Sequence, residues 1–302
     1  MSPLKHAKIV VNEAAHWLRA QHCERRILIK QTRNLGDTLH MTPIARHFKT
    51  KFPGCKIAFL VGKAYASVHE LNPDFDRLFP IDNNLGPQDR ILIKRFIDDE
   101  VVDLDLKICP SIFPFGEVWP SHRWCHQMIS HQIFVNGQIE LDKMLGDKQL
   151  HAPVSNDDRE FATKFIGRNK CIGLEWQSYS HTPLWHMNHF IKVTKLLKAQ
   201  GFQTISFGGL HEGCIDGAMD GRGITWRRTI AILEQCKYML GIGSGVTMLA
   251  ACARPTPHII EIGVSEAISM RGCGYANSTL LQGSSSPENV ADFIAAAERG
   301  NS

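Results

Sequence analysis

An aspartate at position 37 lies where a buried apolar run gives way to a helix-like segment. The run ILIK occupies 27–30, and Asp37 belongs to the stretch QTRNLGDTLHMTP that follows at 31–43. Where parallel strands alternate with helices, ligands bind beyond the carboxyl ends of the strands, and the loop after the first strand is a common contributor. A carboxylate in this loop can accept hydrogen bonds from a ligand, and Gly36 allows a sharp turn before it. The alternative is that Asp37 caps the helix expected at 38–51.

Three closely spaced glycines occur in the second half of the chain, in the stretch GIGSGV at 241–246. Backbone N–H groups at Gly243, Ser244 and Gly245 can approach a phosphate, and the N-terminus of a following helix adds partial positive charge. The stretch is not a dinucleotide fingerprint, because position 246 is Val where that motif requires Gly. A tight strand-to-helix turn that binds no ligand is the alternative interpretation.

Polar residues follow two further expected strands of the second half, in EWQSYSHT at 175–182 and FGGLHE at 207–212. Hydroxyl, amide and imidazole groups in the first stretch are suited to hold phosphate or sugar oxygens. The acid in the second could accept a hydrogen bond from a ribose, as acids do in nucleotide sites. Ordinary polar loops remain the alternative for both. The candidate ligand-binding residues are Gln177, Ser178 and His181 in the first stretch and Gly209 and Glu212 in the second.

A histidine-rich stretch in the first half invites a metal interpretation, because His122 and His126 are one helical turn apart. Cys125 and His131 are near them in sequence, but nothing supplies a second convincing ligand pair. We therefore expect no metal site, and we interpret the stretch as part of an acceptor pocket or as plain surface.

The elements that must position these residues alternate between continuous apolar strands and helices, which indicates parallel sheets covered on both faces. In the first half we expect helix 5–22, strand 26–31, helix 38–51, strand 56–62, helix 64–71, strand 77–81, helix 88–98 and strand 101–108. In the second half we expect a helix starting near Asp157, strand 170–176, helix 186–200, strand 203–209, helix 225–236, strand 238–243, helix 246–253, strand 256–263 and helix 286–298.

Length and composition are those of a globular protein with two domains, since the 302 residues are 43% hydrophobic and 21% charged. The loop formers in HAPVSNDD at 151–158 place the boundary between domains 1–154 and 155–302. A net charge of +4, spread along the chain, is compatible with an anionic substrate and does not require nucleic acid.

The cysteines and the hydropathy pattern bear on the cellular compartment. Nine cysteines without a CxxC pair are typical of reduced thiols in a cytosolic protein. The N-terminus lacks the apolar core of a signal peptide, and no window approaches the roughly 18 to 20 apolar residues of a membrane span. We therefore expect a cytoplasmic protein without stable membrane insertion.

Taken together, several of these blocks resemble glycosyltransferase family 9, the bacterial heptosyltransferases. The resemblance covers roughly 26–82 and 170–263, and its first block is the more specific one. The matching residues of the first block are Leu35-Gly36-Asp37, Pro43, Phe52-Pro53, Asn72-Pro73-Asp74 and Asp76. Those of the second block lie in FGGLHE and in TWRRTIAILEQCKYMLGIGSGVTMLAACARP.

The resemblance implies the α/β GT-B architecture, in which two Rossmann-like, doubly wound parallel-sheet domains face a cleft and the second holds a nucleotide-sugar donor. It implies an inverting sugar transfer without a cofactor or active-site metal, from a nucleoside-diphosphate sugar such as ADP-heptose. Asp37 would be the general base, and Gly243-Ser244-Gly245 would stabilise the leaving diphosphate. The acceptor could be a lipopolysaccharide core, another glycan, a protein or a modified nucleobase. By analogy, the terminal helix 286–298 could pack back on the first domain.

The chain departs from the family pattern at two places that concern the donor. Gly243-Ser244-Gly245 and Met248 stand where the family usually has Asp-Thr-Gly and a following His. Before Trp185, the family often has a phosphate-contacting Lys, and 182–184 read Thr-Pro-Leu here. The donor sugar and nucleotide are therefore left open, and a replacement charge could come from one of three residues: His181, Arg227 or Arg228.

Two other functions stay open. A non-catalytic binding protein that kept the fold would explain the missing Lys and Asp, whereas the retained Asp37 favours an enzyme. A sugar-nucleotide epimerase would need additional carboxylates in the second domain, for which the candidates are Glu175, Glu212 and Glu261.

Overall fold

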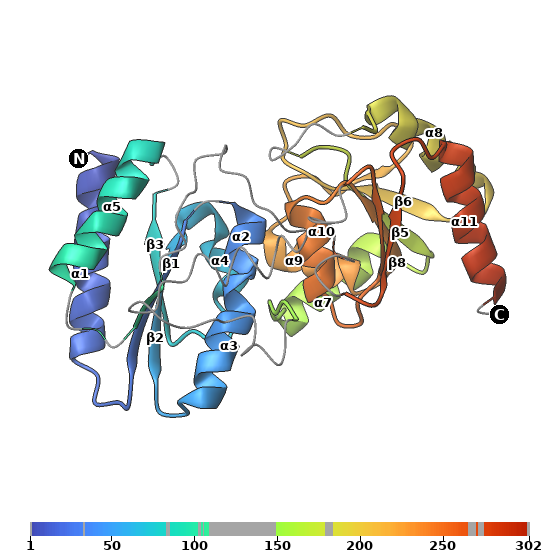
Figure 1. The fold of residues 1–302 in the computed structure, drawn as a ribbon. Coiled ribbons are helices and arrows are strands. Elements are labelled where there is room, and N and C mark those ends of the chain that lie inside the picture. The colour runs from blue at the N-terminus through green and yellow to red at the C-terminus, as the bar shows by residue number, and fades with distance from the viewer. Residues whose placement is uncertain are drawn as a thin grey trace. The chain divides into compact units, whose positions relative to one another are not determined.

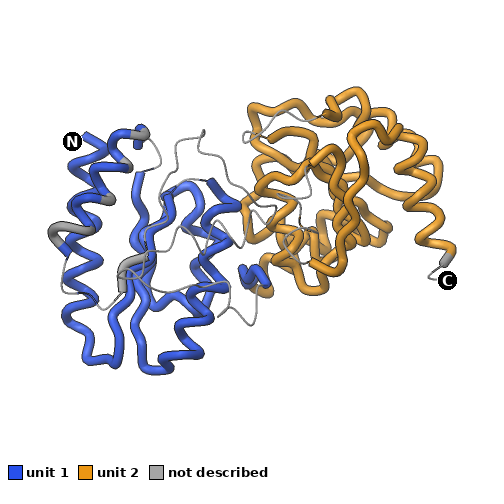
Figure 2. Tube along the Cα trace, in the orientation of Figure 1, with its two compact units in different colours: residues 1–153 blue, residues 154–302 orange. Residues whose placement is uncertain are grey.

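The chain divides into two compact units, Met1–Pro153 and Val154–Ser302, each built on its own sheet (Figure 2). A computed structural model describes residues 2–32, 34–82, 85–101, 104, 106–108, 149–178, 184–264, 270 and 275–300. All strand pairs in both sheets are parallel, as expected for alternating strands and helices.

The first unit contains a four-stranded sheet in the order β3-β2-β1-β4. The central strand β1 pairs along its whole length with β2, with Ile27 opposite Ile57 and Gln31 opposite Val61. This order is half of a doubly wound sheet, and it places the carboxyl end of β1 at the switch point beside β4. The strands are β1 (Arg26–Gln31), β2 (Lys56–Gly62), β3 (Arg77–Ile81) and β4 (Leu106–Ile108).

Helices cover both faces of this sheet (Figure 1). Leu28 belongs to the core formed with α1 and α5, whereas its neighbours Ile27 and Ile29 belong to the core formed with α3. This alternation of faces explains why the strand is apolar throughout. The helices are α1 (Pro3–Arg19), α2 (Leu35–Leu39), α3 (Met41–Lys51), the 3-10 turn η1 (Lys63–Tyr65), α4 (Ala66–His69) and α5 (Pro87–Glu100).

The second unit contains a six-stranded sheet in the order β10-β9-β8-β5-β6-β7. The chain runs from β5 outward to β7 and then returns to the other side of β5 with β8. The carboxyl ends of β5 and β8 therefore flank the topological switch point, where doubly wound folds bind ligands. The strands are β5 (Cys171–Leu174), β6 (Gln203–Ser206), β7 (Met219–Asp220), β8 (Cys236–Gly241), β9 (His258–Ile262) and β10 (Ser278–Leu281).

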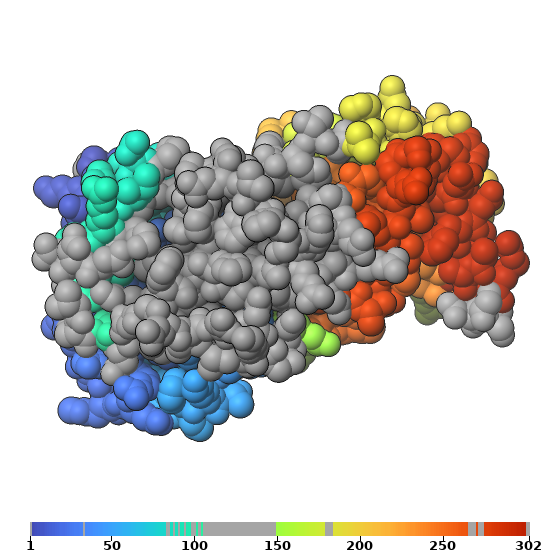
Figure 3. Space-filling view, viewed as in Figure 1, coloured from blue at the N-terminus to red at the C-terminus, as the bar shows by residue number. Residues whose placement is uncertain are grey.

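Two groups of helices cover the second sheet, namely α7, α9 and α10 on one face and α8 with α11 on the other (Figure 1). Figure 3 shows α8 and α11 side by side on the surface of this unit. Val290, Ala291 and Ile294 of α11 are buried in the unit's own core. The terminal helix thus packs its apolar face within the second unit, and packing of this helix on the first domain stays a prediction. The helices are α7 (Asn156–Ile166), α8 (Met187–Ala199), α9 (Trp226–Leu233), α10 (Gly245–Cys252) and α11 (Pro287–Gly300).

The sequence predicted the strands of the first unit better than its helices. The expected strands 26–31, 56–62 and 77–81 are confirmed at both ends. The single helix expected at 38–51 was wrong, because the chain forms α2 and α3 with a break at His40. In the second unit, β7 and β10 were missed, since a two-residue strand and a half-buried edge strand carry no apolar pattern.

Two composition-based expectations can be compared with the described residues. Their six cysteines are all free thiols: Cys23, Cys55, Cys171, Cys214, Cys236 and Cys252. None of the described helices combines the length and the hydropathy that a membrane crossing requires.

Candidate functional site

Asp37 lies in the first turn of α2, shortly after the carboxyl end of β1, and its side chain is partly exposed. The residue before α2 is Asn34, and the residue before α3 is His40, so Asp37 caps neither helix. The capping alternative is therefore wrong. The expected sharp turn at Gly36 is also wrong, because Gly36 has helical backbone inside α2. An ionised acid in a first helical turn is favoured by the helix dipole.

Two side chains fix the short helix that carries this acid. Thr38 donates its hydroxyl to the carbonyl oxygen of Leu35 at 2.8 Å, and the Nε2 of His69 lies 2.9 Å from the same hydroxyl oxygen. Because the threonine proton is already used, the imidazole must donate from Nε2. This pair connects α2 to α4 and restrains the first turn of α2.

The histidine of this pair is neutral because of its surroundings. His69 is 1% exposed and packs edge-on against the rings of Phe59 and Phe75, with centroids 5.1 and 5.6 Å away. Burial lowers the pKa of His69 to about 3. A neutral imidazole can keep its proton on Nε2 for Thr38 throughout the physiological range.

A second carboxyl group lies at the switch point of the second sheet. Glu175 comes directly after β5 and is 3% exposed. Its Oε1 accepts hydrogen bonds from the hydroxyl of Ser244 and from the N–H of Val246 at 3.1 Å. Its Oε2 accepts from the N–H and the hydroxyl of Thr247, at 3.2 and 2.9 Å. The protein thus places its own carboxyl at the N-terminus of α10, a position suited to an anion.

Burial dominates the protonation of this group. It raises the pKa of Glu175 to about 7, although the bonds from Ser244, Thr247 and Val246 all act in the opposite direction. Desolvation disfavours the charged form more strongly than these donors favour it. Glu175 therefore changes its charge near neutral pH.

The glycines of the turn make room for buried carboxyl groups. A Cβ on Gly241 would meet the Thr247 hydroxyl and would lie 3.6 Å from Oε2 of Glu175. Gly243 has a φ of +73°, and a Cβ there would lie 3.3 Å from Oε1 of Glu261. Glu261 is fully buried on β9 and accepts the N–H of Met270 at 2.6 Å. Close packing thus explains why positions 241 and 243 are glycine, independently of any ligand at the turn.

These contacts use only some of the backbone N–H groups at the turn Gly243-Ser244-Gly245 and the start of α10. Glu175 takes the N–H groups of Val246 and Thr247, and Met248 donates its N–H to the carbonyl of Ser244 at 3.2 Å. Within the described residues, the N–H of Gly245 has no hydrogen-bond acceptor. The backbone of Gly243-Ser244-Gly245 thus stays a candidate for binding an anion, whereas the next two N–H groups are taken.

In the loop after β6, the side chain of Glu212 folds back against the backbone at Gly208. Gly208 has a φ of +144°, and the carboxylate of Glu212 lies where a side chain on Gly208 would be. The ring of His211 covers Gly209 in the same way, 2.5 Å from an imagined Cβ. The sequence singled out Gly209, and Gly208 was missed although its φ requires glycine.

Hydrogen bonds connect the loops after β5 and β6. Trp176 donates its ring N–H to the carbonyl of Gly213 at 2.9 Å, and Arg222, which follows β7, fastens the same loop by donating to the carbonyl of Glu212. The half-buried Gln177 and Ser178 directly follow Trp176. Together with the contact between Glu175 and α10, these bonds bring three predicted loops to one edge of the second sheet.

Solved structures similar to this chain are found among glycosyltransferases. The family 9 glycosyltransferase from Veillonella parvula DSM 2008 matches with a TM-score of 0.64, over 86% of each chain at 17% identity. The ADP-heptose lipopolysaccharide heptosyltransferase II of E. coli matches with a TM-score of 0.67, over 90% of this chain and 98% of that one, at 12% identity. The fold is GT-B.

The GT-B fold is also shared with a different class of enzyme. A structure from Listeria monocytogenes, assigned as a UDP-N-acetylglucosamine 2-epimerase, matches with a TM-score of 0.53, over 89% of this chain and 86% of that one, at 10% identity. No protein-family model matches the sequence, and no curated protein matches it. At such identities the likeness shows the fold, and the resemblance to family 9 is confirmed at that level.

Several predicted residues lie outside the described part of the GT-B chain. They include the candidate His181 and the histidine-rich stretch with His122, Cys125, His126 and His131. Within the described ranges, no group of three or more His, Cys, Asp or Glu side chains could hold a metal ion. Metal independence stays a prediction.

The two arginines considered as replacement charges both face α7. The Nε of Arg227 lies 3.4 Å from Asp158, and the guanidinium of Arg228 lies 4.4 Å from the ring centre of Phe161. Asp158 also accepts a hydrogen bond from the backbone N–H of Ser155 at 3.0 Å. Both arginines thus contribute to the packing of α9 against α7.

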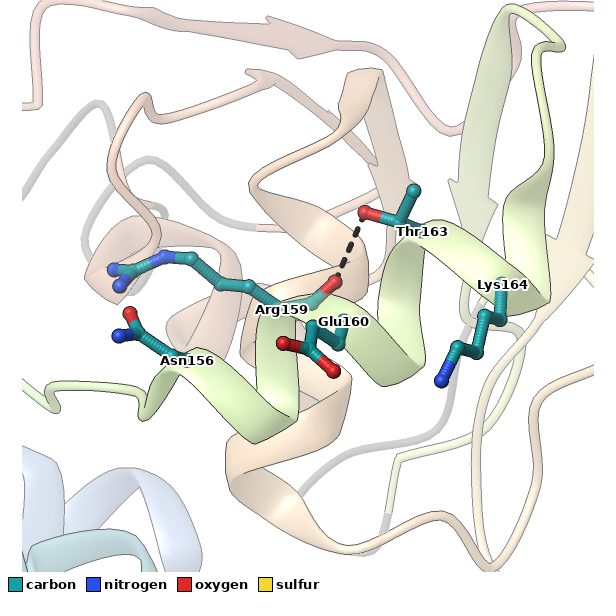
Figure 4. Close-up of a pocket in the computed structure, with 5 residues that line it drawn as sticks. All are labelled: Asn156, Arg159, Glu160, Thr163 and Lys164. Atoms are coloured by element: carbon teal, nitrogen blue, oxygen red, sulfur yellow. Dashed lines mark hydrogen bonds between the residues drawn. The ribbon is translucent and has the colours of Figure 1, made fainter.

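An open depression lies on the surface of α7, away from the predicted site residues (Figure 4). Its lining side chains all come from this one helix. Arg159 there pairs with Glu234 at 2.8 Å. The lining residues are Asn156, Arg159, Glu160, Thr163 and Lys164. A surface formed by one exposed helix face does not have the concave shape of a substrate site.

Proposed function

We propose that this protein is an inverting glycosyltransferase that uses a nucleoside-diphosphate sugar as donor. The observation that carries this proposal is the glycine turn Gly243-Ser244-Gly245, which opens α10 at the switch point between β5 and β8. Doubly wound sheets bind nucleotides at this position, and N–H groups at a helix N-terminus suit a diphosphate. The likeness to glycosyltransferases over both units supports the same assignment.

In the proposed reaction, the first unit supplies the base. Asp37 takes the proton from the acceptor hydroxyl as the hydroxyl oxygen attacks the anomeric carbon of the donor. The bond from that carbon to the diphosphate oxygen breaks, and the diphosphate leaves with the electron pair. The partial exposure of Asp37 allows contact with an acceptor, and the bond between His69 and Thr38 holds its helix in place.

The second unit binds the donor in this proposal. The N–H groups of Gly243, Ser244 and Gly245 bind the diphosphate, and Gln177 and Ser178 hold phosphate or sugar oxygens. The candidates of the neighbouring loop are Gly209 and Glu212. The exposed ring of His211 would have to move away from Gly209 for a ligand to reach its backbone, and Glu212 would accept a hydrogen bond from a ribose hydroxyl. His181 stays a candidate for a charge on the phosphate.

The donor and the acceptor are proposed by class. One similar structure is named as an ADP-heptose lipopolysaccharide heptosyltransferase, which makes ADP-heptose the first donor to test and a lipopolysaccharide core the first acceptor. Another glycan, a protein side chain or a modified nucleobase would be attacked through the same Asp37. The proposed transfer uses no metal ion and no cofactor.

A thermal-shift panel of nucleoside diphosphates and nucleotide sugars tests the donor class. A ligand that binds only the folded state adds about 2.7 kcal/mol of stability at one hundred times its dissociation constant. A shift with one nucleotide that is weakened by Gly245→Val, but not by Gly54→Ala in the first unit, supports the proposed site; a Cβ at position 54 would make only ordinary van der Waals contacts. The proposal fails if no nucleotide shifts the transition, and the non-catalytic alternative then gains support.

An epimerase is the second candidate, because a structure assigned to that class shares the fold. The three acids that such chemistry could use are buried: Glu175 and Glu261 by the turn before α10, and Glu212 against Gly208. Glu175 and Glu261 accept hydrogen bonds from the protein itself, so they are poorly placed to act on a sugar. Incubating a bound nucleotide sugar without acceptor separates the two functions, because only an epimerase converts it into a new nucleotide sugar.

A further inference from the structure

The hydrogen bond between Glu175 and Ser244 can run in two directions. An ionised carboxylate only accepts, so the Ser244 hydroxyl must donate to it. A protonated carboxyl has an O–H to donate, and the serine oxygen can then accept. In that second state the serine proton is available for another acceptor. The protonation of Glu175 thus decides whether the Ser244 hydroxyl can donate a hydrogen bond to a ligand at the turn.

The position of this pair connects it to the proposed donor site. Ser244 is the residue before α10 and the middle of the turn Gly243-Ser244-Gly245. Glu175 lies beneath that turn, where it takes the next two N–H groups. A diphosphate bound on the turn would therefore bring its negative charge close to a buried carboxylate, with little solvent to screen the repulsion.

We propose that donor binding is coupled to the uptake of one proton by Glu175, which turns the Ser244 hydroxyl toward the donor phosphate. The proton comes from solvent and forms an O–H bond on the carboxyl group. This O–H donates to the serine oxygen, and the serine O–H donates to a phosphate oxygen. The inference rests on the proposed function, because it concerns the donor of that reaction.

The protonation equilibrium of the free protein is suited to this coupling. Burial raises the pKa of Glu175 to about 7, so a proton can be gained near neutral pH. A nearby diphosphate raises the pKa further, because a second negative charge disfavours the ionised carboxyl.

The neighbouring titratable groups do not supply a competing explanation. Glu261 on β9 approaches the turn at Gly243, and Glu212 and His211 lie in the loop after β6. The hydrogen-bonding groups of α10 around Glu175 are hydroxyls and backbone N–H groups, which do not titrate near neutrality. Burial raises the pKa of Glu175, and the hydrogen bonds from Ser244, Val246 and Thr247 oppose that increase.

Calorimetric titration of ADP-glucose, with UDP-glucose as second probe, measures this coupling. Both phosphates of these probes are diesters that keep a constant charge near neutrality. Titrations in buffers of different ionisation enthalpy count the protons taken up on binding. The natural protein should take up about one proton above neutral pH, and its affinity should fall up to about tenfold for each pH unit above the pKa of the free carboxyl.

Glu175→Gln is the decisive variant, because an amide N–H can donate to Ser244 and cannot titrate. It should bind the probe with the same affinity near pH 6 and near pH 8, without proton uptake. Glu261→Gln is the matched control, since it neutralises the other buried carboxyl beside the turn. This control should keep the proton uptake of the natural protein.

A second variant tests the same point if Glu175→Gln fails to fold. Thr247→Val removes a hydroxyl that favours the ionised carboxylate, so the pH at which affinity falls should move upward. The inference is overturned if the natural protein takes up no proton, if Glu175→Gln takes up as many as the natural protein, or if Thr247→Val leaves the pH profile unchanged. Binding without any pH dependence leaves the proposed function standing. If neither probe binds at any pH, ADP-heptose replaces them, and failure of all three counts against the proposed function itself.

Discussion

The two units each place a carboxyl group after the first strand of a parallel sheet, but in opposite surroundings. Asp37 follows β1, is partly exposed, and is carried by a short helix that other residues hold in place. Glu175 follows β5, is 3% exposed, and accepts hydrogen bonds from three residues around α10. The same topological position thus leaves one acid partly exposed and keeps the other inside the protein.

This difference teaches that position in the fold does not decide what an acid does. A reactive base needs access to its substrate, and the partial exposure of Asp37 allows this access, while Thr38 and His69 hold its helix in place. A buried acid acts through the groups that it holds, which for Glu175 are Ser244 and the first N–H groups of α10. We expect substitutions at the two acids to separate catalysis from binding and stability.

The largest expected effect is on turnover, in Asp37→Asn. Loss of a general base lowers the rate by about 10² to 10⁴-fold, and the unfolding temperature and nucleotide affinity should not change. The measurement is the release of nucleoside diphosphate from donor and lipopolysaccharide core acceptor. Glu175→Gln near pH 6 is the comparison variant and should keep most of the rate. Equal turnover in Asp37→Asn and in the natural protein would contradict the role of the base.

The next effect is on stability, in Glu175→Ala. This change leaves the N–H groups of Val246 and Thr247 buried without acceptors, at a cost of about 1 to 3 kcal/mol for each group. Scanning calorimetry should show a lower unfolding temperature for Glu175→Ala than for Glu175→Gln, which keeps one acceptor. Asp37→Ala, at a partly exposed position, should change the unfolding temperature much less. An unfolding temperature unchanged in Glu175→Ala would refute the structural part of the comparison.

The pH dependence of stability sharpens the comparison, because the buried groups of the two units act in opposite directions. The pKa of His69 is lowered to about 3 from the 6.5 of a free histidine, so the unfolded chain gains a proton first and stability falls as the pH drops below 6.5. The pKa of Glu175 is raised to about 7, so the folded state keeps a proton that the unfolded chain has lost, and stability falls as the pH rises from 4.5 through 7.

Each dependence should vanish in one variant. His69→Phe should reduce the loss of stability below pH 6.5, and Glu175→Gln should reduce the loss of stability between pH 4.5 and 7. Each unit of pKa difference between the folded and unfolded states corresponds to about 1.4 kcal/mol. Unfolding temperatures across the pH range measure both. If either variant keeps the slope of the natural protein, that group is not its source.

A smaller effect is expected where the loops of the second unit are connected. Trp176→Phe keeps an aromatic ring but removes the N–H that donates to Gly213, a loss of about 1 kcal/mol. Because this bond connects the loops after β5 and β6, nucleotide affinity should fall a few-fold while turnover at saturation stays the same. Trp17→Phe in the first unit is the matched control and should leave nucleotide affinity unchanged.

The smallest effect is expected on α7. Arg159→Ala removes an ion pair between a half-exposed guanidinium and Glu234, which is worth about 1 kcal/mol. Nucleotide affinity and turnover should both stay at the level of the natural protein. A marked loss of either would place a site on the depression of Figure 4 and would require a new assignment.

The sequence predicted most of the sheet architecture because buried parallel strands are continuous apolar runs, and Arg26–Gln31 and Lys56–Gly62 were found at both ends. It also singled out the loops after β1, β5, β6 and β8. It did not predict the break between α2 and α3, since local periodicity continues through His40.

The site itself was predicted in position but not in contacts. Glu175 was considered only as an acid for epimerase chemistry, because the sequence does not show that its carboxyl reaches α10 about 70 residues later. The role of His69 was missed for the same reason, as its partner Thr38 is 31 residues away. Both contacts depend on strand order, which single-sequence patterns do not encode. A glutamate directly after a strand at the switch point was the available signal for Glu175.

The glycine at position 243 has a consequence for which sequences this fold can accept. A side chain there would meet Val264 at about 3.0 Å and the carboxylate of Glu261 at 3.3 Å. An aspartate at 243, as in the Asp-Thr-Gly pattern, would therefore place two acids together in a buried turn. We therefore expect that related chains with Asp at position 243 lack Glu at position 261, and that chains with Glu at 261 lack Asp at 243.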